Sequence, residues 1–419
     1  MIGIGASGPR GDQTPPARGP DAAVQLRATE GGERQSWLDL NLTGVDASLE
    51  RPYWIALSLV PGVGPVGFAR LLHRYGSIRA AWSTGAQLLE ALPRIPDDAS
   101  IGLQRLRREG AQTVARRIEQ ATRRAGGEVL TVLDERYPAS LARLDPRPPV
   151  LYLAGEAAAL DATCVAIVGT RQASGYGRAC ATELADELAR AGVTVISGMA
   201  LGIDGEAHEA AVAAGGRSVG VLPSPLDRIY PPRHRALGSR LVSSGGALLS
   251  ELAPGHQPGR PDFARRNRII AGLASAVVVV EAPDHSGALL TAAAAISYDK
   301  ELYAVPGQID AMASRGCNRL IADQQATLVT SAASLLQRIG ARRGALPIAV
   351  SSLSEAEGLV LATLLKRSAS IEELLASTGL PTGALASVLT MLEARGLTTS
   401  YGGATFHPTL AARHIGRAR

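Results

Sequence analysis

Lysine is almost absent from this chain. Only Lys300 and Lys366 are lysines among its 43 basic residues, so arginine carries nearly all of the positive charge. Neither lysine stands in a Gly-Lys-Ser/Thr sequence, which excludes a phosphate-binding loop of that type and ATP hydrolysis by that route. Two explanations of the arginine bias stay open: a coding preference, or a use of guanidinium groups, which are planar and bind phosphates with two hydrogen bonds.

Cysteine is scarce, and long apolar runs are missing. Cys164, Cys180 and Cys317 are far apart and form no C-x-x-C pair, so we expect neither a disulfide framework nor a zinc site, and a reducing cytoplasm fits. No apolar run approaches the roughly 18 residues that a membrane span needs, and the N-terminus lacks the pattern of a signal peptide. We therefore expect a soluble, cytoplasmic protein with no membrane partner.

Motifs for hydrolytic chemistry are incomplete. His208-Glu209 is followed by Val212, where a zinc protease has its second histidine, and no G-x-S-x-G sequence is present. Asp204 and His208, four residues apart, are either an acid/base pair or a structural pair that orients a loop, and the second reading is favoured. The sequence therefore predicts no catalytic residue, no metal site and no cofactor.

The N-terminal part divides into two segments. Residues 1–47 are rich in Gly, Pro, Asp and Arg, and we predict that they are disordered. Residues 48–126 predict a small helical domain of the SAM or helix-hairpin-helix kind, whose turn at Pro61–Pro65 either holds a phosphate or is purely structural. Arginines then follow on helical spacing, as a solvated face or, less favoured, a DNA contact: Arg105, Arg107, Arg108, Arg116, Arg117, Arg123 and Arg124.

Residues 127–340 predict an α/β domain. Short runs that are apolar on both faces alternate with helical patterns, which indicates an extended Rossmann-like, doubly wound and mostly parallel sheet with helices on either side. Ligands of such sheets bind beyond the carboxyl ends of the strands, where glycines and small hydroxyls recur in this chain. The predicted strands are 165–168, 193–196, 218–221, 248–250, 277–280 and 302–305.

An unusual cluster of positive charge lies between Gly255 and Gly272. Arg265, Arg266 and Arg268 stand near the start of a predicted helix, where free backbone N–H groups already disfavour cations. An anion in front of the cluster would explain it. Because Phe263 adds an aromatic face, the segment combines the charge and the stacking surface that bind single-stranded nucleic acid.

Seven motifs follow one another in order between Ile167 and Gly307. They are Ile167–Arg171 with Tyr176-Gly177, Ser197–Asp204 with Ala207-His208, Tyr230-Pro231, Leu249–Glu251, Phe263 with Arg266–Ile270, Ser286-Gly287 with Thr291-Ala292, and Val305–Gly307. Together they resemble the DprA/Smf family of DNA-processing proteins. The resemblance implies a Rossmann-like domain that forms a homodimer, binds single-stranded DNA in a pocket at its strand ends, and loads RecA recombinase during natural transformation without turning over a substrate.

The same resemblance implies a set of DNA-binding residues. Arg260 stands where the family often has lysine, an exchange that keeps the charge and alters the geometry. The remaining residues form the pocket and a basic, stacking wall beside it: Gly169, Thr170, Arg171, Ser197, Gly198, Phe263, Arg266, Asn267 and Arg268. Some of these arginines have an alternative role as buried ion-pair partners.

The C-terminal part, residues 345–415, predicts a winged helix. Its expected recognition helix, 382–395, carries one Arg and one Glu, which is too little charge for a helix that reads the major groove. We therefore expect this domain to serve protein contacts or to contribute little to DNA affinity. A nucleotide-binding or nucleotide-hydrolysing Rossmann-like protein stays open as the alternative function.

Overall fold

The computed structural model describes residues 25–26, 36–42, 44–92, 95–341, 353–394, 397–401 and 405–408. The chain forms two compact units, residues 1–343 and 344–419. Within the described residues no single helix is long and apolar enough to cross a membrane, and Ile371–Thr378 with Thr382–Glu393 meets that criterion only as a pair bent by 112°. The first unit contains both the predicted helical domain and the predicted α/β domain.

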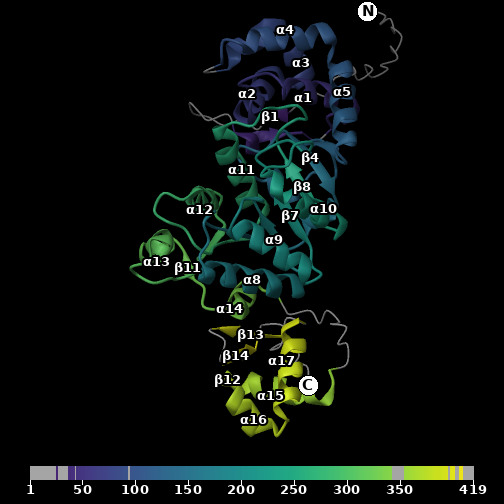
Figure 1. Ribbon diagram of the computed structural model, residues 1–419. Coiled ribbons are helices and arrows are strands. Elements are labelled where there is room, and N and C mark those ends of the chain that lie inside the picture. The colour runs from purple at the N-terminus through teal and green to yellow at the C-terminus, as the bar shows by residue number, and fades with distance from the viewer. Residues whose placement is uncertain are drawn as a thin grey trace, which may run out of the picture. The chain divides into compact units, whose positions relative to one another are not determined.

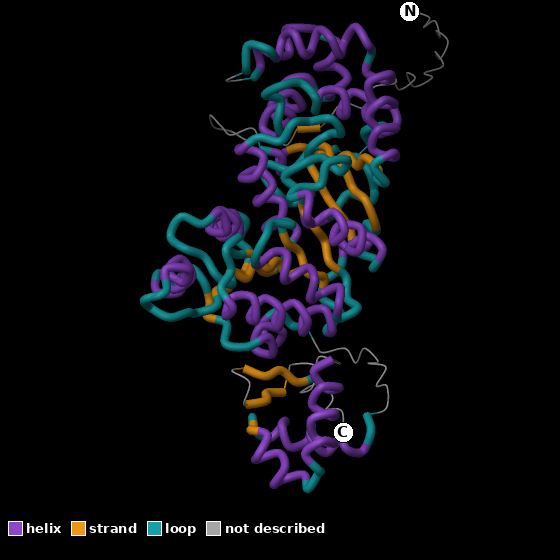
Figure 2. Tube along the Cα trace, viewed as in Figure 1, coloured by secondary structure: helices purple, strands orange, loops and turns teal. Residues whose placement is uncertain are grey.

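A nine-stranded sheet forms the centre of the first unit (Figure 2). Its order is β11-β10-β9-β5-β6-β7-β8-β4-β3; the strands from β11 to β8 are parallel, and β4 and β3 add an antiparallel edge. The predicted mostly parallel sheet is confirmed. The strands are β3 (Glu128–Thr131), β4 (Val150–Gly155), β5 (Cys164–Val168), β6 (Thr194–Ser197), β7 (Ser218–Val221), β8 (Ala247–Ser250), β9 (Ala276–Val279), β10 (Glu301–Ala304) and β11 (Thr327–Leu328).

Helices cover both faces of this sheet (Figure 1). Alternate residues of a strand point to opposite faces, so Val165 and Ile167 of β5 pack with α8 and α9, whereas Ala166 and Val168 pack with α11 and α12. The helices of this part are α6 (Ala139–Ala142), α7 (Ala158–Asp161), α8 (Gly175–Arg190), α9 (Ile203–Ala213), α10 (Arg235–Ser243), α11 (Arg260–Leu273), α12 (Gly287–Ser297), α13 (Arg315–Ala322) and α14 (Ala332–Arg338).

The helical segment packs on the antiparallel edge of the sheet rather than standing apart from it. One continuous apolar cluster joins Trp54 and Ile118 of the helices to Val129 of β3 and Tyr152 of β4. The predicted hairpin is present, with Val66 exposed just after its turn. Its phosphate-binding role stays a prediction. The helices are α1 (Ala47–Leu57), α2 (Pro65–Tyr75), α3 (Ile78–Ser83), α4 (Ala99–Glu109) and α5 (Ala111–Arg124), with a 3-10 turn at Gly85–Ala91.

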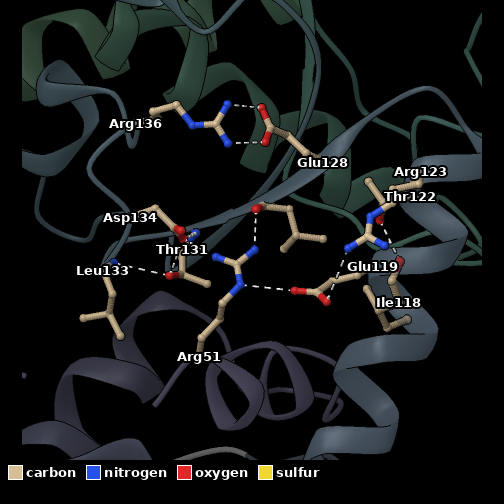
Figure 3. A network of polar contacts seen from close by, with 11 residues as sticks. Arg51, Ile118, Glu119, Thr122, Arg123, Glu128, Thr131, Leu133, Asp134 and Arg136 are labelled. Carbon is tan, nitrogen blue, oxygen red and sulfur yellow. Dashed lines mark hydrogen bonds and ion pairs between the residues drawn. The ribbon is translucent and has the colours of Figure 1, made fainter. Parts of the chain in front are cut away.

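Arg51 of α1 forms a polar link between the helices and the sheet (Figure 3). Its Nε donates to Glu119 of α5 at 3.1 Å, while its terminal nitrogens donate to Asp134 and to the carbonyl oxygen of Val129, at 2.6 Å for the latter. Asp134 also accepts from the backbone N–H and the hydroxyl of Thr131 at the end of β3. One side chain therefore ties two helices to the edge of the sheet.

The ordered chain begins earlier than the sequence predicts. Trp37 lies in a short 3-10 turn, is fully buried, and donates its indole N–H to the carbonyl oxygen of Pro65 at 2.9 Å. Asp145 accepts from the Ser36 hydroxyl at 2.6 Å, and the Arg147 guanidinium lies 5.3 Å from the Trp37 ring centre. The prediction that residues 1–47 are disordered is wrong for the described residues 25–26, 36–42 and 44–47. One large aromatic in a polar segment finds a buried site, and Gln25–Leu26 pairs with Leu40–Asn41 in a two-stranded sheet. Residues 1–24, 27–35 and 43 lie outside the described part.

The second unit has the helices and strands of a winged helix. The helices α15 (Glu355–Lys366), α16 (Ile371–Thr378) and α17 (Thr382–Ala394) accompany a small antiparallel sheet in the order β12-β14-β13. The strands are β12 (Ala369–Ser370), β13 (Thr398–Tyr401) and β14 (Thr405–Pro408). Leu385, Leu389 and Leu392 bury one face of α17, and the helix contains no basic residue. The sequence also predicts a turn at Gly402-Gly403 within the winged helix, and these two residues lie outside the described part.

Replacing Trp37 by Ala tests whether this segment belongs to the fold. Because the indole is fully buried and makes a hydrogen bond, we expect Trp37→Ala to lower the free energy of unfolding by about 3–5 kcal/mol in urea titrations. The neighbouring Leu38 is 56% exposed, so Leu38→Ala is the matched control and should change stability by less than about 0.5 kcal/mol. Equal, small effects of both substitutions would contradict the packing described.

Candidate nucleic-acid interface

The candidate site lies where the order of the parallel strands reverses. Going along the chain, β6, β7 and β8 extend the sheet on one side of β5, and β9 and β10 extend it on the other. The loops that follow β5 and β9 diverge there, and such a switch point is where open α/β sheets bind ligands. An added Cβ at Gly169, directly after β5, would lie 2.5 Å from Ile203 and 2.9 Å from the carbonyl oxygen of Glu281. The loop after β5 therefore needs a glycine at this position.

Glu281, which follows β9, has a structural role at the start of α8. Its two carboxylate oxygens accept from the backbone N–H of Ser174 at 2.9 Å and from the Ser174 hydroxyl at 2.7 Å, and the side chain is buried. A carboxylate at this position also stabilises the N-terminus of α8. The anion-favouring end of α8 is thus already satisfied within the protein, whereas Ser286 and Gly287 at the start of α12 line the pocket itself.

The start of α11 is stabilised by one acidic residue among its arginines. The carboxylate of Asp262 accepts from the backbone N–H of Gly259 at 2.8 Å, and lies 3.8 Å from Arg265 and 3.2 Å from His256. Arg265 is therefore an exposed partner of Asp262. Arg265 thus forms a local ion pair on the surface of α11, and it does not line either hollow.

Arg266 is buried and binds backbone carbonyl groups. Its guanidinium donates to the carbonyl oxygens of Gly198 and Val221, the latter at 2.7 Å, and its Nε donates to Asn267 at 3.1 Å. Burial lowers the pKa of Arg266 to about 10, and the charge of Asp204 opposes that shift. The group stays protonated at neutral pH, and it joins α11 to the ends of β6 and β7.

Asp204 holds the loop that follows β6. Its carboxylate accepts from the backbone N–H groups of Gly198 at 3.1 Å and Ala200 at 3.3 Å. Burial raises the pKa of Asp204, and Arg266 acts in the opposite direction. These contacts agree with the structural reading of Asp204 that the sequence favoured.

His208 is likewise a buried structural residue. The Ser218 hydroxyl donates to the carbonyl oxygen of Val195 at 2.8 Å, so its oxygen accepts from His208 Nδ1, also at 2.8 Å. Burial lowers the pKa of His208 to about 3, with His234 and Arg266 adding to the shift. The imidazole is therefore neutral at pH 7, with its Nδ1 protonated.

A cluster of one guanidinium and two aromatic rings lies beside the pocket, formed by Arg171, Phe263 and Tyr230. The guanidinium carbon of Arg171 lies 5.5 Å from the centre of the Phe263 ring, and the Tyr230 ring meets Phe263 edge-on at 5.7 Å and 88°. A hollow of about 450 Å³ and a smaller one of about 50 Å³ share Arg171 and Phe263 in their linings. The larger one falls in the range of small-molecule binding sites, while the smaller one continues past Tyr230.

The residues implied by the family resemblance divide between these hollows and the interior. Gly198 lines the smaller hollow, while Ser197 and Arg268 line neither. Arg171 and Arg260 are exposed, and no described acidic residue forms an ion pair with them. The structure brings the following together around the larger hollow: Gly169, Thr170, Arg171, Arg260, Phe263, Arg266 and Asn267.

Ser197 and Arg268 have structural roles instead of the expected place in the pocket. The Ser197 hydroxyl is buried and donates to the carbonyl oxygen of Ile167 at 2.6 Å. Arg268 forms an ion pair with Glu251 and donates to the carbonyl oxygen of Pro146 at 3.1 Å. The neighbouring residues Gly198 and Asn267 line a hollow, whereas Ser197 and Arg268 do not. A motif that contains all of them therefore does not reveal which side chains face the ligand.

The predicted set left out the N-terminal end of α12, which lines the pocket. Ser286, Gly287 and Thr291 all lie at the start of α12, and Asn267 donates to the carbonyl oxygen of Gly287 at 3.1 Å. A signal was present, since the Ser286-Gly287…Thr291 motif is one of the seven. Within the described residues no cluster of three or more His, Cys, Asp or Glu side chains has the arrangement of a metal site.

Comparisons with known proteins agree with this architecture. Residues 128–340 match the family model of DNA recombination-mediator protein A, and residues 345–404 match the DprA winged helix domain. A Protein Smf from Synechocystis is 34% identical over 299 residues, which is 70% of this chain and 74% of that protein. The chain belongs to the DNA recombination-mediator protein A family.

The solved structure of one relative has the same fold. The structure of DNA processing protein A from Streptococcus pneumoniae is 28% identical, with a TM-score of 0.57 over 68% of this chain and 95% of that one. A structure of DNA processing protein A from Helicobacter pylori, described for the single-stranded DNA binding mode of that protein, is 30% identical with a TM-score of 0.47, covering 51% and 97% of the two chains.

The packing around Arg266 predicts a strong effect of a single methyl group. An added Cβ at Gly198 would lie 2.0 Å from the Arg266 guanidinium, so Gly198→Ala should displace that group and lower the free energy of unfolding by about 1–3 kcal/mol. At Gly175 nothing lies within 4 Å of the added atom, and Gly175→Ala is the control in the same urea titration. A stable Gly198→Ala variant would show that Arg266 is held loosely.

The neutral state of His208 predicts a pH dependence of stability. The imidazole titrates near pH 6.5 in the unfolded chain and near 3 in the folded one. The contribution of His208 to the free energy of unfolding is therefore complete above pH 6.5 and is lost as the pH falls toward 3. When the pH falls from 7 to 5, the free energy of unfolding of the unsubstituted protein should decrease by about 2 kcal/mol more than that of His208→Gln. Parallel pH profiles of the two proteins in urea titrations would refute the assignment.

Proposed function

We propose that this protein binds single-stranded DNA through the larger hollow and through the Arg171-Phe263-Tyr230 cluster, which joins it to the smaller one. The observation that carries the proposal is the pair of exposed arginines, Arg171 and Arg260, which border the hollow without an ion-pair partner among the described residues. Guanidinium groups bind phosphates, and the aromatic rings of the cluster supply faces for bases. Membership of the DNA recombination-mediator protein A family supports DNA as the ligand.

The arrangement of Arg171 over Phe263 suggests how a base would bind. In the free protein the guanidinium occupies a position over the ring, so an incoming base either displaces Arg171 or stacks on its outer plane. Both outcomes place the Arg171 charge beside the phosphate backbone. Sequence-independent contacts of this kind suit a protein that must accept any incoming strand.

The wider role that we propose is that of a recombination mediator. The homodimer protects incoming single strands in the cytoplasm and loads RecA onto them during natural transformation, and it turns over no substrate. Support comes from the family membership and from two buried acidic side chains near the pocket, Asp204 and Glu281, which accept hydrogen bonds from backbone N–H groups. Neither is free to activate water, which disfavours the alternative of nucleotide hydrolysis.

The winged helix is proposed to contribute little to DNA affinity. Its helix α17 presents Thr382, Ser387, Thr390 and Met391 to solvent, without a basic residue. Contacts with phosphates need cations, and base reading in a groove needs longer polar side chains. Such a surface suits protein contacts better.

Substitutions of the two exposed arginines test the pocket. Arg171→Ala and Arg260→Ala should each weaken binding of a 15-nucleotide oligothymidine, and each should lower the slope of log K against log salt by about 0.7, the value for one lost phosphate contact on a single strand. Arg217 is also exposed, but it lies just before β7, at the N-terminal ends of the parallel strands, whereas the pocket lies at their C-terminal ends. Arg217→Ala is therefore the matched control.

The same titration distinguishes a strand from a nucleotide. A mononucleotide should compete poorly with the oligothymidine, and RecA filament formation on coated strands should fall in both pocket variants. Unchanged affinity in Arg171→Ala and Arg260→Ala, or equal affinity for a mononucleotide, would reject the proposal in favour of a nucleotide-binding protein.

A further inference from the structure

Helices α4 and α5 concentrate the positive charge of the chain. Residues 99–126 contain seven arginines and two glutamates, an excess equal to the net charge of +5 of the whole chain. The same stretch contains no aromatic residue. The pocket proposed above uses none of these side chains, so this surface needs its own explanation.

Both glutamates of this stretch form ion pairs with arginines. Glu119 accepts from Arg51 at 3.1 Å and lies 4.0 Å from Arg123. Glu109 forms a two-bond ion pair with Arg117 at 2.8 and 3.1 Å. The charge of Arg105 also lowers the pKa of Glu109, so Arg105 of α4 and Arg117 of α5 lie near the same carboxylate, and the two helices share one surface.

The outer face of α5 is a row of cations and neutral polar groups. Val114 and Ile118 bury the opposite face. Arginine pairs occur at 116/117 and 123/124, seven residues apart, which is about 10 Å along a helix axis. The exposed residues of α5 are Gln112, Thr113, Arg116, Arg117, Gln120, Arg123 and Arg124.

Helix stability accounts for only part of this charge. Arg123 and Arg124 lie in the last turn of α5, where cations interact favourably with the helix dipole. Arg116 stands in the middle of α5, and Arg105 in the middle of α4, outside the range of that effect. Arg105, Arg108, Arg116 and Arg124 are exposed and form no ion pair with any described acidic residue.

We propose that the α4–α5 face binds the phosphate backbone of double-stranded DNA. A single strand gains much of its affinity from bases stacked on aromatic side chains, and neither α4 nor α5 contains one. The neighbouring Tyr53 accepts from Gln112 through its hydroxyl, and its ring packs edge-on against Trp82. A duplex keeps its bases stacked inside and presents only phosphates, which arginine, glutamine and threonine side chains bind without reading sequence. The chemistry of this face therefore matches a duplex.

The position of the face allows both kinds of DNA to be bound at once. Figure 1 shows α5 well separated from α11 and α12, which border the pocket. All of these helices belong to the first compact unit. A strand in the pocket and a duplex on α4–α5 would not compete, so the unit could hold a substrate that contains both single-stranded and double-stranded segments.

The test compares duplex and single-strand binding in the full-length chain. Arg116→Ala/Arg124→Ala should weaken binding of a 30-base-pair duplex by about tenfold and lower its salt slope by about 1.8, the value for two phosphate contacts on a duplex. Arg116→Glu/Arg124→Glu should weaken it further. Binding of 15-nucleotide oligothymidine should be unchanged in both, and Arg143→Ala/Arg217→Ala, two exposed arginines elsewhere in the unit, is the matched control.

Several outcomes would overturn this inference. They are a native protein that does not bind the duplex, equal duplex binding by the charge-reversal variant, or an equal loss in the control variant. Binding of vesicles with phosphatidylglycerol that depends on Arg116 and Arg124, with duplex binding unaffected, would assign the face to anionic lipid instead. Because Arg171→Ala should leave duplex binding intact, failure of the pocket proposal and failure of this one are distinguishable.

Discussion

The hydrogen bonds of the buried Arg266 guanidinium hold together the segments that form the pocket. One side chain of α11 binds the carbonyl oxygens of Gly198 after β6 and Val221 at the end of β7, and Asp204 binds the N–H groups of the same loop. Burial of a charge is costly unless its hydrogen bonds are made. The start of α11 is thereby held over the ends of the strands, which places Arg260 and Phe263 at the rim.

Arginines of this chain have a structural role in the interior and a proposed binding role at the pocket. Arg51, Arg266 and Arg268 are wholly or partly buried and bind carboxylates or carbonyl groups across elements that are distant in sequence. Arg171 and Arg260 are exposed at the pocket. A guanidinium suits both tasks because it stays charged when buried and forms several hydrogen bonds in one plane. The scarcity of lysine is consistent with both uses.

The sequence predicted the fold better than it predicted the site. The strands β5 to β10 lie within one residue of their expected positions, because strands buried on both faces read as continuous apolar runs. Trp37 was missed because local composition does not reveal a buried partner 28 residues away at Pro65. Arg266 and Arg268 were expected to contact the ligand together with Arg260. Arg266 lines the hollow while its guanidinium donates to backbone carbonyl groups, whereas Arg268 lines neither hollow and pairs with Glu251. Charge alone does not show whether a side chain faces a carboxylate, a carbonyl group or solvent.

Single-stranded DNA in the hollow bordered by Arg171, Arg260 and Phe263 would lie within crosslinking distance of the residues around it. The decisive measurement is photo-crosslinking of an oligonucleotide containing 5-bromodeoxyuridine to the full-length chain, followed by identification of the modified peptides. We expect crosslinks in residues 169–172, at Tyr230 and in residues 260–264. Crosslinks confined to the winged helix or to α4–α5, with none around the hollow, would contradict it.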